Sequence, residues 1–227
     1  MLVFFCYNSL KIGKFLVVSD LHSGIESLML EKGALFPRII NKKMLDDLLI
    51  LQEISKTRVL IINGDVKHEF SKELAEIFDL KNFFRKLKEF WEEIIIVKGN
   101  HDFFIENIAF SLRIPVFKRI NIRNRFVITH GDKYYDDFKK RTFIIGNEHP
   151  FLKIRELNIE KPVFLVNRYL IVLPAFNTFL KGNNILNKSF LSPYFDYLEG
   201  DERVFNVVMV ELLDKKIESF NFGKIRL

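Results

Sequence analysis

The chain has 227 residues, of which 48% are hydrophobic and 28% charged, and its 35 basic and 29 acidic residues give a net charge of +6. This length suits one domain over residues 1–227, and the composition excludes a disordered tail. A helical membrane protein is excluded as well, because no apolar run approaches the roughly 20 residues that a spanning helix needs.

The opening residues form an apolar segment, MLVFFCY. No basic region precedes it and no small-residue cleavage site follows it, so it indicates a first strand rather than a signal peptide. The only cysteine of the chain, Cys6, lies in this segment. A lone cysteine forms no internal disulfide, so we expect a buried thiol in a cytoplasmic protein.

Short apolar runs then recur along the chain and predict five buried strands. These runs are residues 15–19, 59–63, 94–97, 126–129 and 143–145. Two helices are expected between them, one from residue 40 onward and one capped by Ser71. The apolar face of the second helix is expected to consist of Leu74, Ile77, Phe78, Phe84 and Leu87.

The last third of the chain is richer in strands. Residues 163–166, 169–173, 204–212 and 217–222 are strand-like, with a hairpin turn at residues 213–216. Alternating strands and helices followed by further strands indicate a layered α/β (α+β) fold with a mixed sheet. We find no linker, no repeat and no break in composition, which again favours a single domain.

Polar and ionisable side chains follow each of the five predicted buried strands. They are Asp20 and His22, then Asp65, then Asn100, His101 and Asp102, then His130, and finally Asn147 and His149. The remaining histidine, His68, lies three residues after Asp65. Ligands bind at the carboxyl ends of strands in such sheets, so these side chains are expected to meet. Each of these motifs alone is typical of an ordinary turn, whereas the five motifs together indicate a functional site.

Carboxylates and imidazoles together suit a pair of divalent ions such as manganese, iron, zinc or nickel. Asp65 is placed in the middle of the set, where its carboxylate can bridge two ions. Two ions roughly 3.5–4 Å apart clamp a phosphate and lower the pKa of bound water toward ~7, which provides a hydroxide nucleophile. A histidine that binds no metal would protonate the leaving oxygen as a general acid.

This series of motifs resembles the calcineurin-like metallophosphoesterase superfamily. The segments that carry the resemblance are SDLHSGIE, NGDVKHEF, VKGNHD, ITHGDK and IGNEHP. Their sequences are most similar to those of the SbcD-related phosphoesterases of archaea and bacteria. The resemblance implies a double β-sandwich flanked by helices, with the site at the carboxyl ends of strands. It also implies two divalent ions, with manganese as the first choice. The chain is too short for the separate capping domain of the large repair nucleases.

The resemblance assigns roles to individual residues. The metal ligands would be Asp20, His22 and His149 at the first ion, Asp65 as the bridge, and Asn100, His130 and Asn147 at the second ion. His101 would be the general acid, with Asp102 as the residue that orients it. The family usually has a histidine where this chain has Asn147, so we expect a weaker second metal site.

The function implied is that of a metal-dependent phosphoesterase. A phosphodiester substrate, either nucleic acid or nucleotide, is favoured over a phosphoprotein by the SbcD-like wording and the basic charge. The alternative is a non-catalytic binding or scaffold protein that keeps the fold with a weakened second metal site, an interpretation that Asn147 raises. Binding of manganese or zinc at micromolar concentration would separate the two. No membrane partner is expected.

Basic side chains surround the predicted strand that ends at His130. They are Lys118, Arg119, Arg123 and Arg125 before the histidine, and Lys133, Lys139, Lys140 and Arg141 after it. They fit contact with a nucleic acid backbone beside the site and equally a solvated surface. Both interpretations stay open on the sequence.

Overall fold

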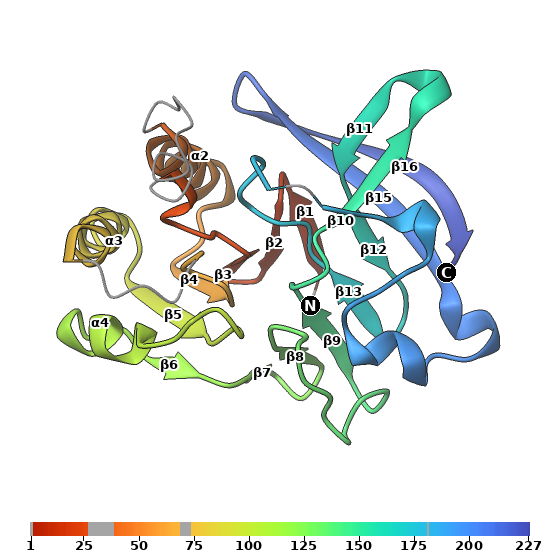
Figure 1. Ribbon diagram of the computed structural model, residues 1–227, viewed down its shortest axis with the longest axis horizontal. Helices are drawn as coiled ribbons and strands as arrows, with labels where there is room; N and C mark the ends of the chain where they lie inside the picture. Colours follow the sequence, from red (N-terminus) through yellow and green to blue (C-terminus); the bar gives the residue numbers. More distant parts are fainter. Residues whose placement is uncertain (1, 27–38, 69–73, 181) are drawn as a thin grey trace.

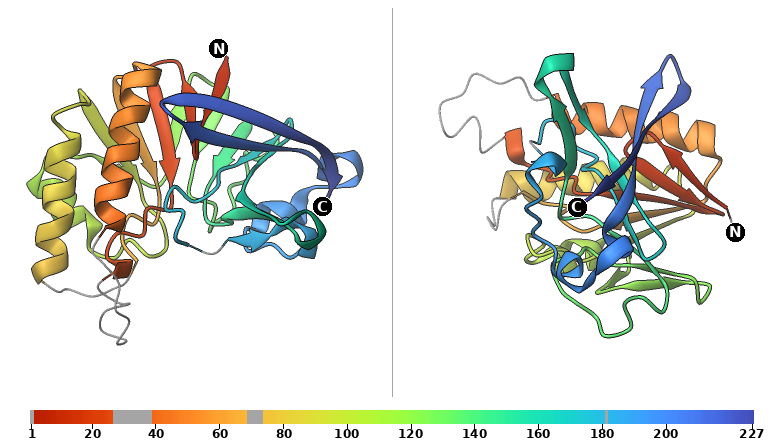
Figure 2. Two further views of the ribbon diagram at one scale, coloured as in Figure 1. Left: turned by 90° about the horizontal axis from the view of Figure 1, so that it is seen from above. Right: turned by 90° about the vertical axis from the view of Figure 1, so that its right-hand side faces the viewer.

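The computed structural model describes residues 2–26, 39–68, 74–180 and 182–227. Two mixed β-sheets pack face to face, and helices cover the outer face of the first sheet (Figures 1 and 2). The expected double β-sandwich flanked by helices is therefore confirmed. Within the described ranges, no helix is both long and apolar enough to cross a membrane.

The first sheet contains six strands in chain order. They are β1 (Val3–Cys6), β2 (Ser9–Ile12), β3 (Phe15–Ser19), β4 (Val59–Asn63), β5 (Glu93–Val97) and β6 (Val116–Phe117). Strands β3 to β6 run parallel to one another, whereas β2 pairs antiparallel with both β1 and β3. Every residue of β4 is buried, as expected for an apolar strand with both faces covered. Cys6 on β1 is buried as predicted.

The helices α2 (Ile40–Ser55), α3 (Leu74–Leu87) and α4 (Ile105–Ser111) lie on the outer face of this sheet. On α3 the buried side chains are Leu80, Phe83, Phe84 and Leu87. Phe78, which we expected on this face, is 61% exposed, because 3.6 residues per turn place it on the opposite side of the helix. Ser71 and the side chain of Leu74 lie outside the described residues.

The second sheet contains seven strands in the order β16-β15-β12-β13-β9-β8-β7. They are β7 (Ile120–Ile122), β8 (Phe126–Ile128), β9 (Thr142–Ile145), β12 (Phe164–Val166), β13 (Leu170–Val172), β15 (Val204–Leu213) and β16 (Lys216–Arg226). Strands β8, β9 and β13 run parallel. The predicted hairpin turn joins β15 to β16 through Asp214 and Lys215, which both have positive φ (47° and 62°), as a two-residue hairpin loop requires.

A small third sheet and several 3-10 turns lie beside the second sheet. The sheet consists of β10 (Pro150–Ile154), β11 (Ile159–Pro162) and β14 (Asn183–Asn184). The turns are η1 (Arg155–Leu157), η2 (Ile185–Asn187), η3 (Pro193–Tyr197) and η4 (Gly200–Arg203). Buried Tyr194 and Phe195 of η3 pack on the face of the second sheet that is turned away from the first.

Alternating side chains of β4 show how the layers are held together. Leu60 and Ile62 join the core beneath the helices, whereas Val59 and Ile61 join the core between the two sheets. Burying apolar surface on both faces stabilises each layer against the next, at roughly 25 cal/mol per Å². The packing brings the carboxyl ends of β3, β4 and β5 close to those of β8 and β9.

Candidate metal centre

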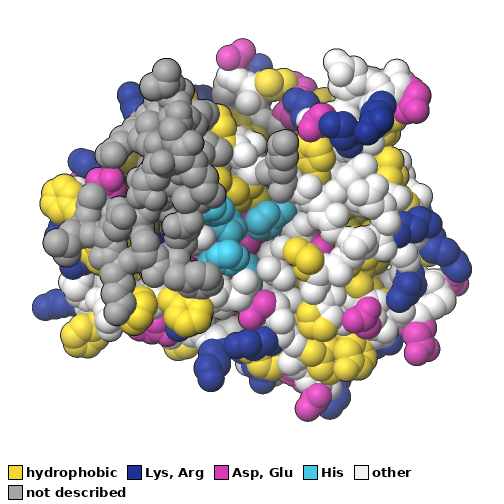
Figure 3. Space-filling model, in the orientation of Figure 1, with side chains coloured by type: hydrophobic (Ala, Val, Ile, Leu, Met, Phe, Trp, Pro, Cys, Tyr) yellow, Lys and Arg dark blue, Asp and Glu magenta, His cyan; other side chains and the backbone are white. Residues whose placement is uncertain are grey.

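The side chains that the sequence predicts as metal ligands meet where the two sheets come together. Asp20, Asp65 and Asn100 lie beyond the carboxyl ends of β3, β4 and β5 in the first sheet. His130 and His149 lie beyond the ends of β8 and β9 in the second sheet. Figure 3 shows the exposed histidine side chains gathered at the centre of one face of the molecule.

The backbone turns sharply at the residues that carry the ligands. Asp20, His22, Asp65 and His149 all have positive φ values, of 57°, 42°, 46° and 45°. Non-glycine residues rarely adopt this conformation, and such strain gathers at functional sites. Two backbone hydrogen bonds hold the loops against each other: the N–H of Asp20 donates to the carbonyl of Gly64 (3.2 Å), and that of His22 to the carbonyl of Asp65 (2.8 Å).

Two glycines make room for the ligands. A Cβ atom on Gly64, where φ is +83°, would lie 2.0 Å from Nδ1 of His130. A Cβ atom on Gly99 would lie 2.2 Å from Oδ1 of Asp65. Any larger residue at either position would push the ligand aside, so the Gly that precedes Asp65 and the Gly that precedes Asn100 are part of the site.

The ligand atoms form two groups that share one carboxylate. Asp20, His22 and His149 form the first group, and Asp20, Asp65 and His130 form the second. Within each group the ligand atoms lie within 4.8 Å of one another. In the first group, Nε2 of His149 lies 3.2 Å from Oδ1 of Asp20.

Asp65 lies between the two groups through its two carboxylate oxygens. Its Oδ2 is 3.5 Å from Nε2 of His22, and its Oδ1 is 3.4 Å from Nε2 of His130. Asn100 joins the second group, since its Oδ1 lies 3.0 Å from Nε2 of His130. These contacts are compatible with a bridging role of Asp65, which stays a prediction, whereas the carboxylate that belongs to both groups is that of Asp20.

The donor atoms fit divalent cations. In the described part of the chain, Nε2 of His22 and Nε2 of His149 are buried and have no hydrogen-bond partner. Buried polar atoms without a partner are rare in folded proteins. Here both nitrogens lie close to carboxylates, and a mixture of imidazole nitrogens and carboxylate oxygens suits manganese, iron, zinc or nickel. We conclude that the residues present fit a metal pair.

Burial and charge shift the titration of these groups in different directions. Burial lowers the pKa of His22 to about 4, although Asp20 and Asp65 favour its charged form. Burial also disfavours charge on His130, but a hydrogen bond to Asp65 and the charge of Asp20 raise its pKa to about 9. Burial would raise the pKa of Asp20, yet the nearby histidines, His149 above all, hold it below its ordinary range.

A second layer of polar contacts orients the ligands. The carbonyl of Asn63 lies 3.3 Å from Nδ1 of His130, so this carbonyl accepts the Nδ1 proton and leaves Nε2 for the metal. The side-chain amide of Asn63 donates to the carbonyl of Thr129 across the two sheets (3.0 Å). Asn63 was not among the site residues predicted from the sequence. The signal that could have found it is the polar residue that directly follows the apolar run VLII at the end of the strand.

His101 lies at the edge of the site, next to His22 and His68. Its Nδ1 lies 3.1 Å from the carbonyl of His68, and its backbone N–H donates to Oδ1 of Asp65 (3.0 Å). The rings of His101 and His68 both lie within 5.4 Å of the His22 ring. The Nδ1 of His68 is 3.3 Å from that of His22, so the structure brings His68 into contact with a ligand. No role was predicted for His68 from the sequence.

Asp102 holds two loops together through backbone amides. Its Oδ1 accepts hydrogen bonds from the N–H groups of Val66 (2.8 Å) and Lys67 (3.3 Å), and its Oδ2 accepts one from Gly99 (2.9 Å). Burial raises the pKa of this carboxyl to about 6, and the amide from Gly99 partly offsets the effect. Through these contacts, Asp102 connects the loop that follows β4 with the segment that carries His101.

Asn147 contacts the site through its backbone. Its N–H lies 3.3 and 3.2 Å from the two carboxylate oxygens of Asp20, and its φ of 62° directs the chain toward the site. This amide helps to neutralise Asp20. A role of the Asn147 side chain in binding metal remains a prediction.

The structure separates the basic residues that the sequence groups around His130. Arg125 and residues 139–141 come just before β8 and β9, at the ends of these strands opposite the site. Arg119 is paired with Asp137 (2.7 Å), and Arg141 is paired with the same carboxylate. Lys118 follows β6 at the edge that carries the site, and Lys133 lies three residues after His130. Contact of Arg125 and residues 139–141 with a substrate at this site is therefore not supported.

Comparison with known proteins agrees with this geometry. A family model described as calcineurin-like phosphoesterase matches residues 13–206. The crystal structure of the Pseudomonas putida nuclease MPE is similar, with 19% sequence identity, a TM-score of 0.67 and coverage of 91% of each chain. The Aquifex aeolicus protein of unknown function AQ665 is a weaker match, with 18% identity, a TM-score of 0.38 and coverage of 63% of this chain and 81% of that chain. No curated protein matches the chain.

Proposed function

The chain belongs to the calcineurin-like phosphoesterase family and is a metal-binding phosphoester hydrolase, and we propose that its substrate is a phosphodiester of a nucleic acid or nucleotide. The observation that carries this proposal is the pair of ligand groups that share Asp20, with Asp65 between them. Seven residues would hold the metals: Asp20, His22, Asp65, Asn100, His130, Asn147 and His149. Manganese is our first choice of metal.

Divalent ions bound to these residues would polarise the phosphoryl oxygens and lower the pKa of water at the site. The protein's part is to hold the ligands in place without further rearrangement. The backbone hydrogen bonds between the loops, together with Gly64 and Gly99, fix Asp65 and His130 in position. Preorganised charge of this kind supplies much of the stabilisation of a transition state.

His101 is proposed as the group that protonates the leaving oxygen. The carbonyl of His68 accepts the proton on Nδ1 of His101, so the proton that moves is the one on Nε2. The backbone N–H of His101 donates a hydrogen bond to Oδ1 of Asp65, and this contact holds His101 at the border of the metal centre. Asp102 keeps the segment around His101 in register with the loop after β4 through the amides of Val66 and Gly99.

Three observations support a diester substrate. The net charge is +6, and Lys118 and Lys133 lie at the edge of the sandwich that carries the site. Figure 3 shows Lys and Arg side chains on the same face as the histidines, at a short distance from them. The similar fold of a nuclease is consistent with this substrate class. A polyanion would be attracted by such a surface.

The proposal is tested by assaying the purified protein with manganese, iron, zinc or nickel against three substrates. These are bis-p-nitrophenyl phosphate, p-nitrophenyl phosphate and short single-stranded DNA. We expect metal-dependent hydrolysis of the diesters to exceed that of the monoester, and chelation to abolish it. Hydrolysis of the monoester alone would contradict the diester assignment. If neither manganese nor zinc binds at micromolar concentration, the protein is instead a scaffold that keeps the fold.

A further inference from the structure

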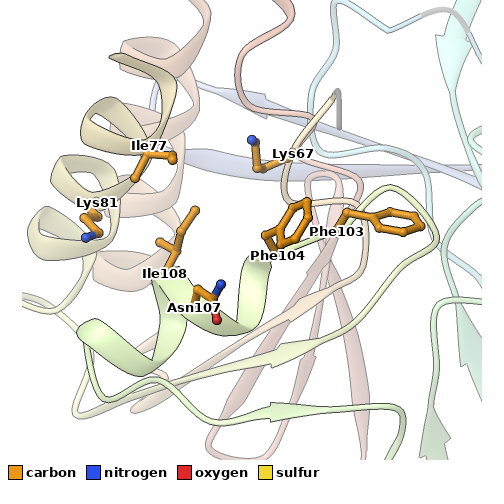
Figure 4. Close-up of a pocket in the computed structure, with 7 residues that line it drawn as sticks. All are labelled: Lys67, Ile77, Lys81, Phe103, Phe104, Asn107 and Ile108. Atoms are coloured by element: carbon orange, nitrogen blue, oxygen red, sulfur yellow. The ribbon is translucent and has the colours of Figure 1, made fainter. Parts of the chain in front are cut away.

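A pocket of about 380 Å³ lies between α3 and α4, next to the segment that carries His101 (Figure 4). The residues that line it are Lys67, then Ile77 and Lys81 of α3, Phe103 and Phe104 just before α4, and Asn107 and Ile108 of α4. Its size falls in the range of small-ligand sites, about 300–1,000 Å³. We refer to it as the aromatic pocket.

The two phenylalanines of the aromatic pocket are unusually exposed. The exposed fraction is 55% for Phe103 and 45% for Phe104. In Figure 4, Phe104 lies below Lys67 and to the right of Ile108, while Phe103 extends away from α3 and α4. Phe104 also has a positive φ of 61°, a strained conformation for an aromatic residue. Both residues line the pocket and are partly exposed, and an aromatic ring offers a face on which a base can stack.

The aromatic pocket is joined to the metal centre through short segments of chain. The N–H of Phe103 donates to the carbonyl of His101 (2.9 Å). On the opposite wall, the N–H of Lys67 donates to Oδ1 of Asp102 (3.3 Å), and Lys67 directly precedes His68. A ligand in the pocket would therefore contact Phe103, which lies two positions after the proposed proton donor, His101, in the chain.

The lining of the pocket suits a nucleobase attached to a phosphate. Phenylalanine rings stack on bases without regard to sequence. Asn107 offers an amide that can donate to or accept from the edge of a base, and the ammonium group of Lys81 can face a phosphate. A simple alkyl ester has no planar ring to stack on a phenylalanine and no polar edge to pair with the amide.

We propose that the aromatic pocket binds the base next to the scissile phosphodiester, by stacking on Phe103 and Phe104. This inference rests on the proposed function, and it narrows the substrate class to diesters that carry a nucleobase on the leaving side of the phosphate. The base would be anchored beside His101, so that the leaving oxygen is presented to its Nε2.

Binding of a cleavage-resistant dinucleotide tests the inference without depending on turnover. The probe is a thymidine dinucleotide in which a methylene group replaces the bridging oxygen, and its partner is the same compound with one base removed. Both are titrated by calorimetry into the manganese-loaded protein. We expect the base-bearing probe to bind about tenfold more tightly, as one stacked base provides.

Variants locate the effect in the pocket. Phe103→Leu and Phe104→Leu should each reduce the preference for the base-bearing probe to about twofold or less, whereas Phe103→Trp should retain it. Phe110→Leu is the matched control, because Phe110 lies on α4 close to the two phenylalanines and is 86% exposed but does not line the pocket. Thermal unfolding of each variant checks that the fold is intact.

Two outcomes would overturn the inference. One is equal binding of the base-bearing and base-free probes by the unmodified protein. The other is an undiminished preference in both leucine variants. Either result leaves the proposed function standing if bis-p-nitrophenyl phosphate is hydrolysed in a metal-dependent reaction. Absence of that hydrolysis, together with a base preference that depends on Phe103, would instead contradict the proposed function alone.

Discussion

Nε2 of His130 lies 3.0 Å from Oδ1 of Asn100, although the two residues follow strands of different sheets. His130 follows β8 of the second sheet and Asn100 follows β5 of the first. The second ligand group is therefore complete only when the sandwich is closed. Because a metal bound there contacts both sheets, its binding free energy adds to the stability of the fold.

Asp65→Asn should remove activity and weaken metal binding at both groups together. Each oxygen of Asp65 faces a different histidine, and a neutral amide cannot neutralise two cations. Loss of outer-shell partners of a metal typically costs about 10–100-fold, so we expect at least about a 100-fold loss of activity for a shared ligand. Metal content by elemental analysis and kcat on bis-p-nitrophenyl phosphate measure both effects.

Asp46→Asn serves as the control for this variant, since Asp46 is an exposed carboxylate on α2. Near-normal turnover of Asp65→Asn with two metals bound would show that the assigned site is wrong.

In the metal-free protein the pKa of Asp65 is lowered: burial alone would raise it, but the hydrogen bond and charge of His130 outweigh this effect. The charged form therefore favours the fold at neutral pH, so Asp65→Asn should also lower the melting temperature of the metal-free protein.

Metal binding at the second group should release a proton. The pKa of His130 is raised to about 9 in the metal-free protein, so this residue is protonated at pH 7, and a metal must displace its proton. The apparent affinity should rise roughly tenfold per pH unit between pH 7 and 8 and level off near pH 9. Calorimetry at pH 7 in two buffers of different ionisation enthalpy counts the released protons. An affinity that is independent of pH over this interval would contradict the prediction.

Asn147→His should strengthen the second metal site. An amide oxygen is a weaker donor than an imidazole, so the unmodified protein should bind two metals in unequal steps, with activity following the second step. The variant should narrow this gap and lower the metal concentration needed for half-maximal activity. The backbone should tolerate the change, because His, like Asn, is enriched at positive φ.

Calorimetric titration distinguishes this account from a purely structural role for Asn147. If the residue acts only through its backbone N–H to Asp20, Asn147→His leaves the titration unchanged. Two sites of equal affinity in the unmodified protein would contradict the prediction as well.

His101→Ala should slow poor leaving groups far more than good ones. An alkoxide needs a proton as it departs, whereas nitrophenolate needs little, so the loss on a dinucleotide should be about 10²–10⁴-fold and much smaller on bis-p-nitrophenyl phosphate. Both rates are measured at saturating manganese, and the metal content of the variant is checked. Equal losses on the two substrates would make His101 a structural residue or a ligand.

Much of the fold could be predicted because its signals are local. Each of the five central strands is an apolar run that ends at a polar turn, and the structure has β3 and β4 with the predicted bounds. The residues that follow these strands converge because strand ends at one edge of a sheet lie together. For the same reason Asp20, Asp65 and His130 could be chosen from the sequence before any contact was known.

Other features depend on contacts that are distant in the chain. An apolar run indicates a buried strand but not its sheet, so the division of β5 and β8 between two sheets was not predictable from the runs themselves. The role of Asp102 on the amides of Val66 and Gly99 depends on loops that meet only in the folded chain. Arg125 is near His130 in sequence, yet an intervening strand places it at the opposite end of the sheet.

Anomalous diffraction from crystals soaked in manganese tests the central claim most directly. The account predicts two manganese peaks, one among Asp20, His22 and His149 and the other among Asp65, Asn100 and His130. Both peaks should weaken in Asp65→Asn. A single peak, or peaks located away from these residues, would contradict the claim that the edge shared by the two sheets holds a metal pair.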